Sequence, residues 1–331
     1  VQSTFRAPYH DVNEGIFEAI SHLEQNTIRT FFEDSRLVIP ARSSGYGVDQ
    51  LVMTSSAGPL IRIVILGLLE DVSLASARHL AGMVQGVVVD AIGLNDPRRQ
   101  DSQIDIILQA HPDLLIITGG TNSGATRSMA KIVETLNFTL PLFPRDKRPE
   151  IIFAGNEVIA NQVKDALAKL VEVHIAPNIR PEIGHENLAP AAEILNETIM
   201  RIRARQIGGF QSYQTICTVP PVPTYHAFGR VVRFLSKINN PTKGVMGIDL
   251  GPSSLCVATA EKGNLHLSIN TLGIDHVPSR LLNEISISDI TRWTPGLLTD
   301  VQARDLIWQK SLQPGSTPAT SETLALEHAL A

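Results

Sequence analysis

A carboxylate beside a glycine-rich turn is the feature of this sequence with the clearest chemical meaning. Residues 244–260, GVMGIDLGPSSLCVATA, hold an apolar segment that ends at Asp249, a turn that begins at Gly251, and a second apolar segment. An aspartate that ends a buried strand can hold a metal ion, and turn amides can hold a phosphate. Taken alone, the segment fits an ordinary β-hairpin better, because Gly-Pro and Ser-Ser are common in turns. The segment therefore predicts either a metal and phosphate site with Ser253 and Ser254 or a plain hairpin.

A second candidate anion site follows an earlier apolar segment. The run DLLIITGG at 113–120 leads through Thr121 into a helical pattern. Amides at a helix N-terminus favour an anion, and glycines let it approach the backbone closely. The spacing matches neither the dinucleotide fingerprint nor a Walker loop. Asn156 follows the next apolar run, so we expect Gly119, Gly120, Thr121 and Asn156 to line one edge of the fold. The alternative is a capped turn without a ligand.

The elements that must position these residues alternate regularly from residue 61. Runs rich in Val, Ile and Leu indicate strands buried on both faces, which is typical of a parallel sheet, and helical patterns separate them. Five strands with four intervening helices predict an α/β fold with a doubly wound parallel sheet of flavodoxin or Rossmann type. Ligands of such sheets bind beyond the carboxyl ends of the strands. The expected strands are 61–68, 86–92, 113–120, 150–155 and 171–176.

The pattern changes beyond residue 180, where prolines punctuate the connections. Helices are expected over about 188–206 and 224–238. Residues 255–270 supply two strands joined at Lys262-Gly263-Asn264, which would turn the hairpin at Asp249 into a three-stranded meander. Further helices are expected at about 275–285 and 299–310. The chain should thus have three parts: a helical and extended segment at 1–60, the doubly wound domain at 61–180, and helices with the meander at 181–331.

Composition limits the class of protein. Of the 331 residues 43% are hydrophobic and 18% charged, which favours a well-buried core. A net charge of −5 with scattered basic residues argues against nucleic-acid binding. No apolar run has the roughly 18 residues that a spanning helix needs. Two cysteines, Cys217 and Cys256, make no disulfide framework or zinc motif. We therefore expect a cytoplasmic protein that binds neither nucleic acid nor membrane. Because no methionine begins the sequence, we also expect a fragment of a longer chain.

Several spaced segments, in this order, resemble the MutL-type glutamate mutase accessory proteins, relatives of the actin-fold reactivating factors for cobalamin-dependent enzymes. These segments are IRIVILGL, PDLLIITGGTNSGA, EIIFAGNEVIANQV, APNIRPEIGHENLAPAAEIL, GIDLG and LALEHALA. The resemblance covers nearly the whole chain and does not concern the DNA-repair protein of the same name. It implies a doubly wound domain inserted into or attached to a partial actin-like (ribonuclease H-type) domain.

The resemblance also implies function. The expected role is that of a reactivase or chaperone for a cobalamin-dependent mutase subunit, with ATP or ADP and Mg²⁺ as cofactors. Asp249 would be the catalytic and metal-binding residue, and Gly251, Ser253 and Ser254 would approach phosphate. The family tends to show Asp-x-Gly-Gly-Ala-Thr-Thr-Asp at this loop, whereas Pro252 follows Gly251 here. A proline removes one backbone donor, so ATP hydrolysis by this chain stays open.

A second hypothesis belongs to another class. In it the chain is a non-enzymatic binding module, and its α/β domain recognises a protein or an anionic ligand through Gly119, Gly120, Thr121 and Asn156. An unidentified α/β enzyme ranks last, because no acid, base and nucleophile converge in the sequence. Direct cobalt ligation is not expected, since the sequence after the first strand lacks the Asp-x-His-x-x-Gly loop of cobalamin-carrying domains. The residues leave a homo-oligomer open.

Overall fold

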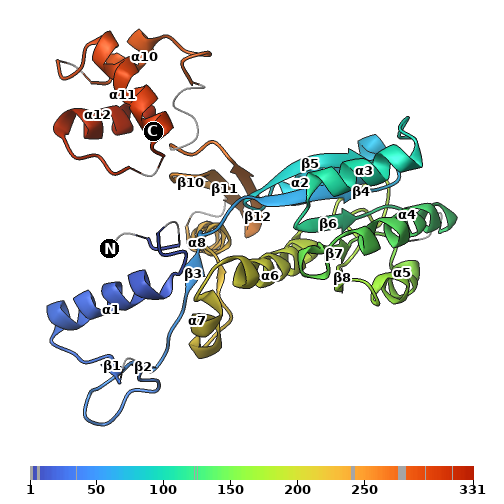
Figure 1. Cartoon of the computed structure of the whole chain (residues 1–331), viewed down its shortest axis with the longest axis horizontal. Coiled ribbons are helices and arrows are strands. Elements are labelled where there is room, and N and C mark those ends of the chain that lie inside the picture. The colour runs from blue at the N-terminus through green and yellow to red at the C-terminus, as the bar shows by residue number, and fades with distance from the viewer. Residues whose placement is uncertain are drawn as a thin grey trace. The chain divides into compact units, whose positions relative to one another are not determined.

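The computed structural model describes the chain in two compact units (Figure 1). The first unit comprises Val1–Ala81 and Gly86–Ala227, and the second comprises Gly82–Gln85 and Phe228–Ala331. The residues described are 3–5, 8–34, 36–122, 124, 126–239, 243–274, 281–294, 296–314 and 316–331. Each unit is considered by itself below. The expected domain boundaries near residues 60 and 180 stay predictions.

A five-stranded parallel sheet forms the centre of the first unit. The strands run in the order β5-β4-β6-β7-β8. All five strands expected from the apolar runs are present. The order reverses between β4 and β6, because β5 is added on one side of β4 and the later strands on the other. The bounds are Ile61–Leu66 for β4, Gly86–Ile92 for β5, Leu114–Ile117 for β6, Glu150–Phe153 for β7 and Val173–Ile175 for β8.

Both faces of this sheet are covered by helices. Alternate strand residues such as Val64, Leu115 and Ile151 belong to one core cluster with residues of α3, α4 and α5. The other residues of the same strands, such as Ile63 and Ile116, are equally buried, and α2 and α6 contact the strands outside that cluster. This burial on both faces explains the continuous apolar runs. The helices are α2 (Ala75–Ala81, after the π-turn η1 at Glu70–Leu74), α3 (Gln100–Ala110), α4 (Arg127–Thr139), α5 (Ala160–Leu167) and α6 (Ala189–Gln206).

The rest of the first unit flanks this domain. Strand β3 (Thr54–Ser55) pairs in parallel with β9 (Val222–Pro223), so the chain enters and leaves the five-stranded domain at neighbouring points. The N-terminal part holds α1 (Asn13–Thr27) and the short hairpin β1 (Phe32–Glu33) with β2 (Arg36–Leu37). The remaining short elements are η2 (Leu140–Leu142), η3 (Arg145–Lys147), η4 (Glu157–Ile159) and α7 (Phe210–Ile216).

The second unit contains the predicted three-stranded meander. Strands β10 (Val245–Leu250), β11 (Leu255–Glu261) and β12 (Asn264–Asn270) pair antiparallel in that order. The helix α8 (Thr224–Ile238), most of which lies in this unit, packs on one face of the meander. Three helices form a separate small core, namely α10 (Ile287–Thr291), α11 (Asp300–Leu312) and α12 (Ser321–Leu330). The helix expected at 275–285 falls mostly on 275–280, outside the described residues.

One local expectation about the meander is wrong. The strand that ends at Asp249 was expected to be buried, yet Met246 and Ile248 are 65% and 63% exposed. The reason is topological: β10 stands at an edge of the meander, and α8 covers only one face. None of the described helices is long and apolar enough to cross a membrane.

Candidate functional site

The loops after β6 and β7 meet at the carboxyl edge of the five-stranded sheet, as the sequence predicted. Because β6 and β7 are hydrogen-bonded neighbours, their loops begin side by side. The amide of Asn156 donates to the carbonyl of Gly119 at 3.1 Å. The Asn156 side chain is fully buried, accepts from the Val158 amide at 3.0 Å and donates to the Gly124 carbonyl at 3.4 Å. Gly119, Gly120, Thr121 and Asn156 therefore belong to one edge.

The glycines of this edge have structural reasons of their own. Gly119 and Gly120 have φ values of 133° and 75°, which favour glycine. A Cβ on Gly119 would lie 2.6 Å from Cγ of Leu68, and one on Gly155 would lie 2.7 Å from the Gly119 carbonyl oxygen. Leu68 of the loop after β4 thus packs directly against Gly119. Close backbone packing is enough to explain why glycine occupies these positions. The glycines alone are therefore not evidence that this edge binds a ligand.

Asn178, which sequence reasoning missed, completes the network at this edge. Its side chain is 1% exposed and donates to the Gly120 carbonyl at 3.0 Å and to Oδ1 of Asn122 at 2.8 Å. Its position in the sequence could have identified it, because Asn178 follows the fifth strand at the same distance as Asn156 follows the fourth. Asparagine amides do not titrate, and a satisfied buried network of this kind stiffens loops. The described residues of this edge therefore offer rigid hydrogen-bonding groups.

A titratable cluster connects α2 with the loop after β8. The Glu186 carboxylate lies 3.1 Å from Nδ1 of His79 and 4.0 Å from the Arg180 guanidinium. Burial would raise the pKa of Glu186, but hydrogen bonds from Ser76 and His79 and nearby positive charge hold it below its usual value. The carboxylate is thus kept ionised as an acceptor. Nδ1 of His79 contacts Glu186, but none of the described hydrogen bonds joins Nε2 of His79 to a serine, so the cluster lacks the order of a catalytic triad.

In the second unit, Asp249 is the next-to-last residue of β10 and lies opposite Cys256 on β11. The aspartate is exposed, whereas the cysteine is buried. Burial, with a smaller effect of the Asp249 charge, raises the pKa of the Cys256 thiol to about 11. No described lysine or arginine forms an ion pair with Asp249, whose carboxylate is accessible. This exposed carboxylate can reach a metal ion at the end of the strand.

The turn after Asp249 supplies only part of a phosphate cradle. The Gly251 amide donates to the Ser254 carbonyl at 2.9 Å, and the Gly251 carbonyl accepts from Ile274 at 3.1 Å. Pro252 has no amide hydrogen. Within the turn, Ser253 and Ser254 are left as the residues that could donate to a phosphate. This turn in the second unit therefore holds one predicted group of site residues, namely Asp249, Gly251, Ser253 and Ser254. The other predicted group, which contains the two glycines and Asn156, belongs to the first unit.

A comparison with known protein families gives a match that spans nearly the whole chain. Residues 2–331 match the family model described as MutL protein. The chain belongs to the MutL family. This is the glutamate mutase accessory family and not the DNA-repair one, as the sequence resemblance indicated. No curated protein matches the chain.

At the amino edge of its five-stranded sheet, this MutL chain holds a buried ionic cluster that the sequence did not reveal. Glu150, which begins β7, is 2% exposed and accepts from Arg205 and from Nε2 of His174, the latter at 2.7 Å. Nε of Arg201 lies 3.6 Å from the same carboxylate. The ligand atoms of Glu150, Glu172 and His174 lie close enough together to bind one metal ion. The guanidinium groups of Arg201 and Arg205, both on α6, already neutralise the Glu150 carboxylate. The cluster is therefore an ion-pair contact between α6 and the sheet, called the clamp below.

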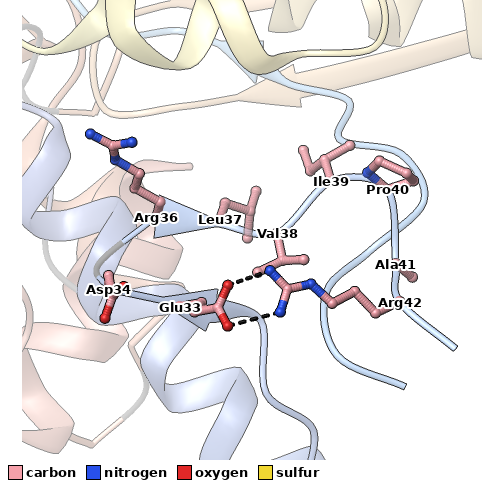
Figure 2. Close-up of a pocket in the computed structure, with 9 residues that line it drawn as sticks. All are labelled: Glu33, Asp34, Arg36, Leu37, Val38, Ile39, Pro40, Ala41 and Arg42. Atoms are coloured by element: carbon pink, nitrogen blue, oxygen red, sulfur yellow. Dashed lines mark hydrogen bonds and ion pairs between the residues drawn. The ribbon is translucent and has the colours of Figure 1, made fainter. Parts of the chain in front are cut away.

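A surface hollow follows the β1–β2 hairpin of the first unit (Figure 2). Residues 33, 34 and 36–42 line it, and Nη1 of Arg42 lies 2.8 Å from Oε1 of Glu33. The hydrogen bond from Arg42 lowers the pKa of Glu33. Both side chains are about half exposed, so the ion pair contributes little to stability. None of the predicted site residues lies here.

Proposed function

We propose that this MutL-family chain is an accessory protein of the reactivating or chaperone-like kind for a cobalamin-dependent mutase, namely glutamate mutase. The match of residues 2–331 to the family carries the proposal. The geometry is compatible with it, because the described residues of both candidate sites offer binding groups and do not bring an acid, a base and a nucleophile together. The cytoplasm is the compartment proposed for this role.

The architecture supports the finer fold assignment that the resemblance implied. In order of appearance the strands of the parallel sheet run 2-1-3-4-5, which is the order of flavodoxin-like doubly wound sheets. The adjacent strands β3 and β9, between which this domain is connected, support an insertion. The antiparallel meander with α8 on one face supports a partial actin-like domain in the second unit.

In this proposal the actin-like part binds ATP or ADP with Mg²⁺ at the end of β10. Asp249 would hold the metal, directly or through water, and Ser253 and Ser254 would donate to phosphate. Gly251 would fix the turn through its bond to Ser254. The metal would supply charge neutralisation of the phosphates. Because the turn provides only part of a cradle, the proposal is nucleotide binding, and hydrolysis is not assumed.

Calorimetric titration of Mg-ATP and Mg-ADP into the full chain tests the nucleotide site. We expect micromolar binding that is lost in Asp249→Ala, whose exposed side chain can be removed with the fold intact. Glu261→Ala is the matched control, since this exposed acid of the same meander pairs only with neighbouring Lys262 among the described ion pairs. Absent binding by the unaltered chain would refute the nucleotide site and leave the accessory role standing.

The alternative function is a non-enzymatic binding module that uses the carboxyl edge of the parallel sheet for a protein or an anionic ligand. The gathering of Gly119, Gly120, Thr121 and Asn156 at one rigid edge favours it. Gly120→Val should abolish binding to the mutase, because valine is strained at the φ of 75°. Gly184→Val is its control, since nothing lies within 4 Å of a Cβ there. Equal binding by both variants would exclude this edge.

A further inference from the structure

Arg180, in the loop after β8, has a guanidinium group that donates to no acceptor in the described part of the chain. The side chain is 19% exposed, and its Nε atom is buried without an acceptor. Its one described ion pair, with Glu186 at 4.0 Å, is too long for a hydrogen bond. Arg148 and Arg201 also have a buried Nε without an acceptor, but another nitrogen of each guanidinium group donates a hydrogen bond. Arg180 therefore lacks the acceptors that a largely buried group with five donors normally has.

The backbone around Arg180 is fixed at the carboxyl edge of the parallel sheet. The Arg180 amide donates to Oδ1 of Asn178 at 2.9 Å, and the Asn178 side chain donates in turn to the Gly120 carbonyl. On the other side of Arg180, the carbonyl of Pro181 accepts from the amide of Asn122 at 3.1 Å. Hydrogen bonds on both sides therefore hold Arg180 beside the loop that follows β6.

The guanidinium group of Arg180 lies near α2. It is 4.0 Å from Glu186, and Glu186 contacts His79 of α2 at 3.1 Å. Because α2 follows β4, Arg180 lies between the segments that follow β4 and β6. The strand order of the sheet reverses between these two strands, and ligands of doubly wound sheets bind at such a point. Arg180 is therefore placed where a ligand of this sheet would lie.

The loop after β6 supplies a second set of donors without acceptors. Among the described residues, no acceptor takes the amide hydrogens of Gly120 and Thr121 or the hydroxyl hydrogen of Thr121. Both residues are half-buried. The amide of Gly119 differs, because a Cβ on Gly155 would lie 3.0 Å from its nitrogen, so Gly155 covers it. Successive amides of a loop can donate together to one anion.

We propose that Arg180 and the amides of Gly120 and Thr121 bind the phosphate group of a small-molecule ligand. The inference rests on the alternative function above, in which this edge binds an anionic ligand, and it adds the arginine and the chemical group. The guanidinium group and the two amides come from different loops. A phosphate group offers three oxygens that can accept from both loops at once, whereas a carboxylate offers two. Because the Asn178 network already fixes both loops, binding needs little further ordering.

Glu186 limits the affinity of this site for an anion. Burial raises the pKa of Glu186, but hydrogen bonds from Ser76 and His79 and nearby positive charge outweigh it, so the carboxylate is ionised. This negative charge lies 4.0 Å from the guanidinium group and would repel a phosphate bound there. Glu186→Gln removes the charge and keeps the shape of the side chain. It should therefore strengthen phosphate binding about threefold at low salt.

Titration calorimetry of inorganic phosphate into the full chain tests the site. Arg180→Ala should weaken phosphate binding about tenfold, because charge-assisted hydrogen bonds are lost. Arg99→Ala is the matched control, since it removes the same charge from an exposed arginine of the loop after β5 that has no described ion pair. Succinate at the same ionic strength should bind more weakly than phosphate. Equal phosphate affinity of the two variants would overturn the proposal, and so would equal binding of succinate and phosphate.

Two further measurements separate lost binding from lost folding or from binding elsewhere. Glu186→Gln does not depend on removing the arginine, and a phosphate affinity that stays equal or falls in this variant would also overturn the proposal. Phosphate should raise the thermal midpoint followed by far-UV circular dichroism, which reports both units. The midpoint followed by the fluorescence of Trp293 and Trp308, which lie in the second unit, should stay in place. A shift of the fluorescence midpoint alone would locate phosphate in the second unit and contradict the inference.

Failure of this inference is distinguishable from failure of the alternative function. A chain that binds no phosphate contradicts the phosphate site. Capture of the mutase by the same edge is measured separately, with Gly120→Val and its control Gly184→Val.

Discussion

Replacing Glu150 with alanine should destabilise the first unit by about 3 kcal/mol, at the lower end of the range for breaking a buried ion pair. The carboxylate is 2% exposed, and its removal leaves His174, at 12% side-chain exposure, without its acceptor. Arg201 and Arg205 are 39% and 58% exposed and can turn to water, which keeps the loss from being larger. The clamp between α6 and the amino edge of the sheet would be lost.

Urea unfolding followed by two probes measures this effect. Far-UV circular dichroism reports both units, whereas the two tryptophans, Trp293 and Trp308, lie in the second unit. The circular dichroism transition of Glu150→Ala should shift by about 1 M urea, given a slope of 2 to 3 kcal/mol per M for a unit of this size. The tryptophan fluorescence transition should stay in place and serves as the internal reference.

Glu172→Ala is the matched control for this experiment. Glu172 lies 3.9 Å from the same His174 but is 59% exposed, so its loss should cost at most about 0.5 kcal/mol. If Glu150→Ala and Glu172→Ala unfold at the same urea concentration, the clamp does not contribute as the structure indicates.

Two further predictions concern titration. Burial raises the pKa of Glu150, but the hydrogen bond from His174 and the positive charges of Arg205 and Arg201 outweigh it and hold the pKa below 4.5 in the folded state. The stabilising contribution of Glu150 is therefore present above pH 4.5 and is lost as pH falls through the lowered value. Acid unfolding should therefore be less steep for Glu150→Gln than for the unaltered chain, and equal slopes would contradict this. With a pKa of about 11, Cys256 should react with a thiol reagent at pH 8 at least a hundredfold more slowly than in unfolded protein. Fast labelling of Cys256 in a Cys217→Ser variant would show that it is not buried.

The parallel sheet was predictable from sequence because burial on both faces leaves a continuous apolar run. Such runs marked β4 and β6, and each strand is almost fully buried apart from Arg62. Strand neighbours also fix where loops begin, which placed Asn156 beside Gly119 correctly. These inferences needed only local pattern and the geometry of parallel strands.

What the sequence did not reveal depends on contacts between distant residues. Glu150 meets His174 and Arg205 across 24 and 55 positions, and no local pattern indicates such pairs. The exposure of Met246 was missed for a similar reason, because an apolar strand does not show whether another element covers its outer face. The roles of Asp249 and Gly120 in binding stay predictions.

Restoration of an inactivated glutamate mutase tests the proposed accessory role most directly. Mutase that has lost activity during turnover would be incubated with fresh adenosylcobalamin and Mg-ATP, with and without the full chain. We predict that activity returns only when the chain is present. If the mutase neither regains activity nor forms a complex with the chain in a parallel sedimentation experiment, the accessory role is contradicted.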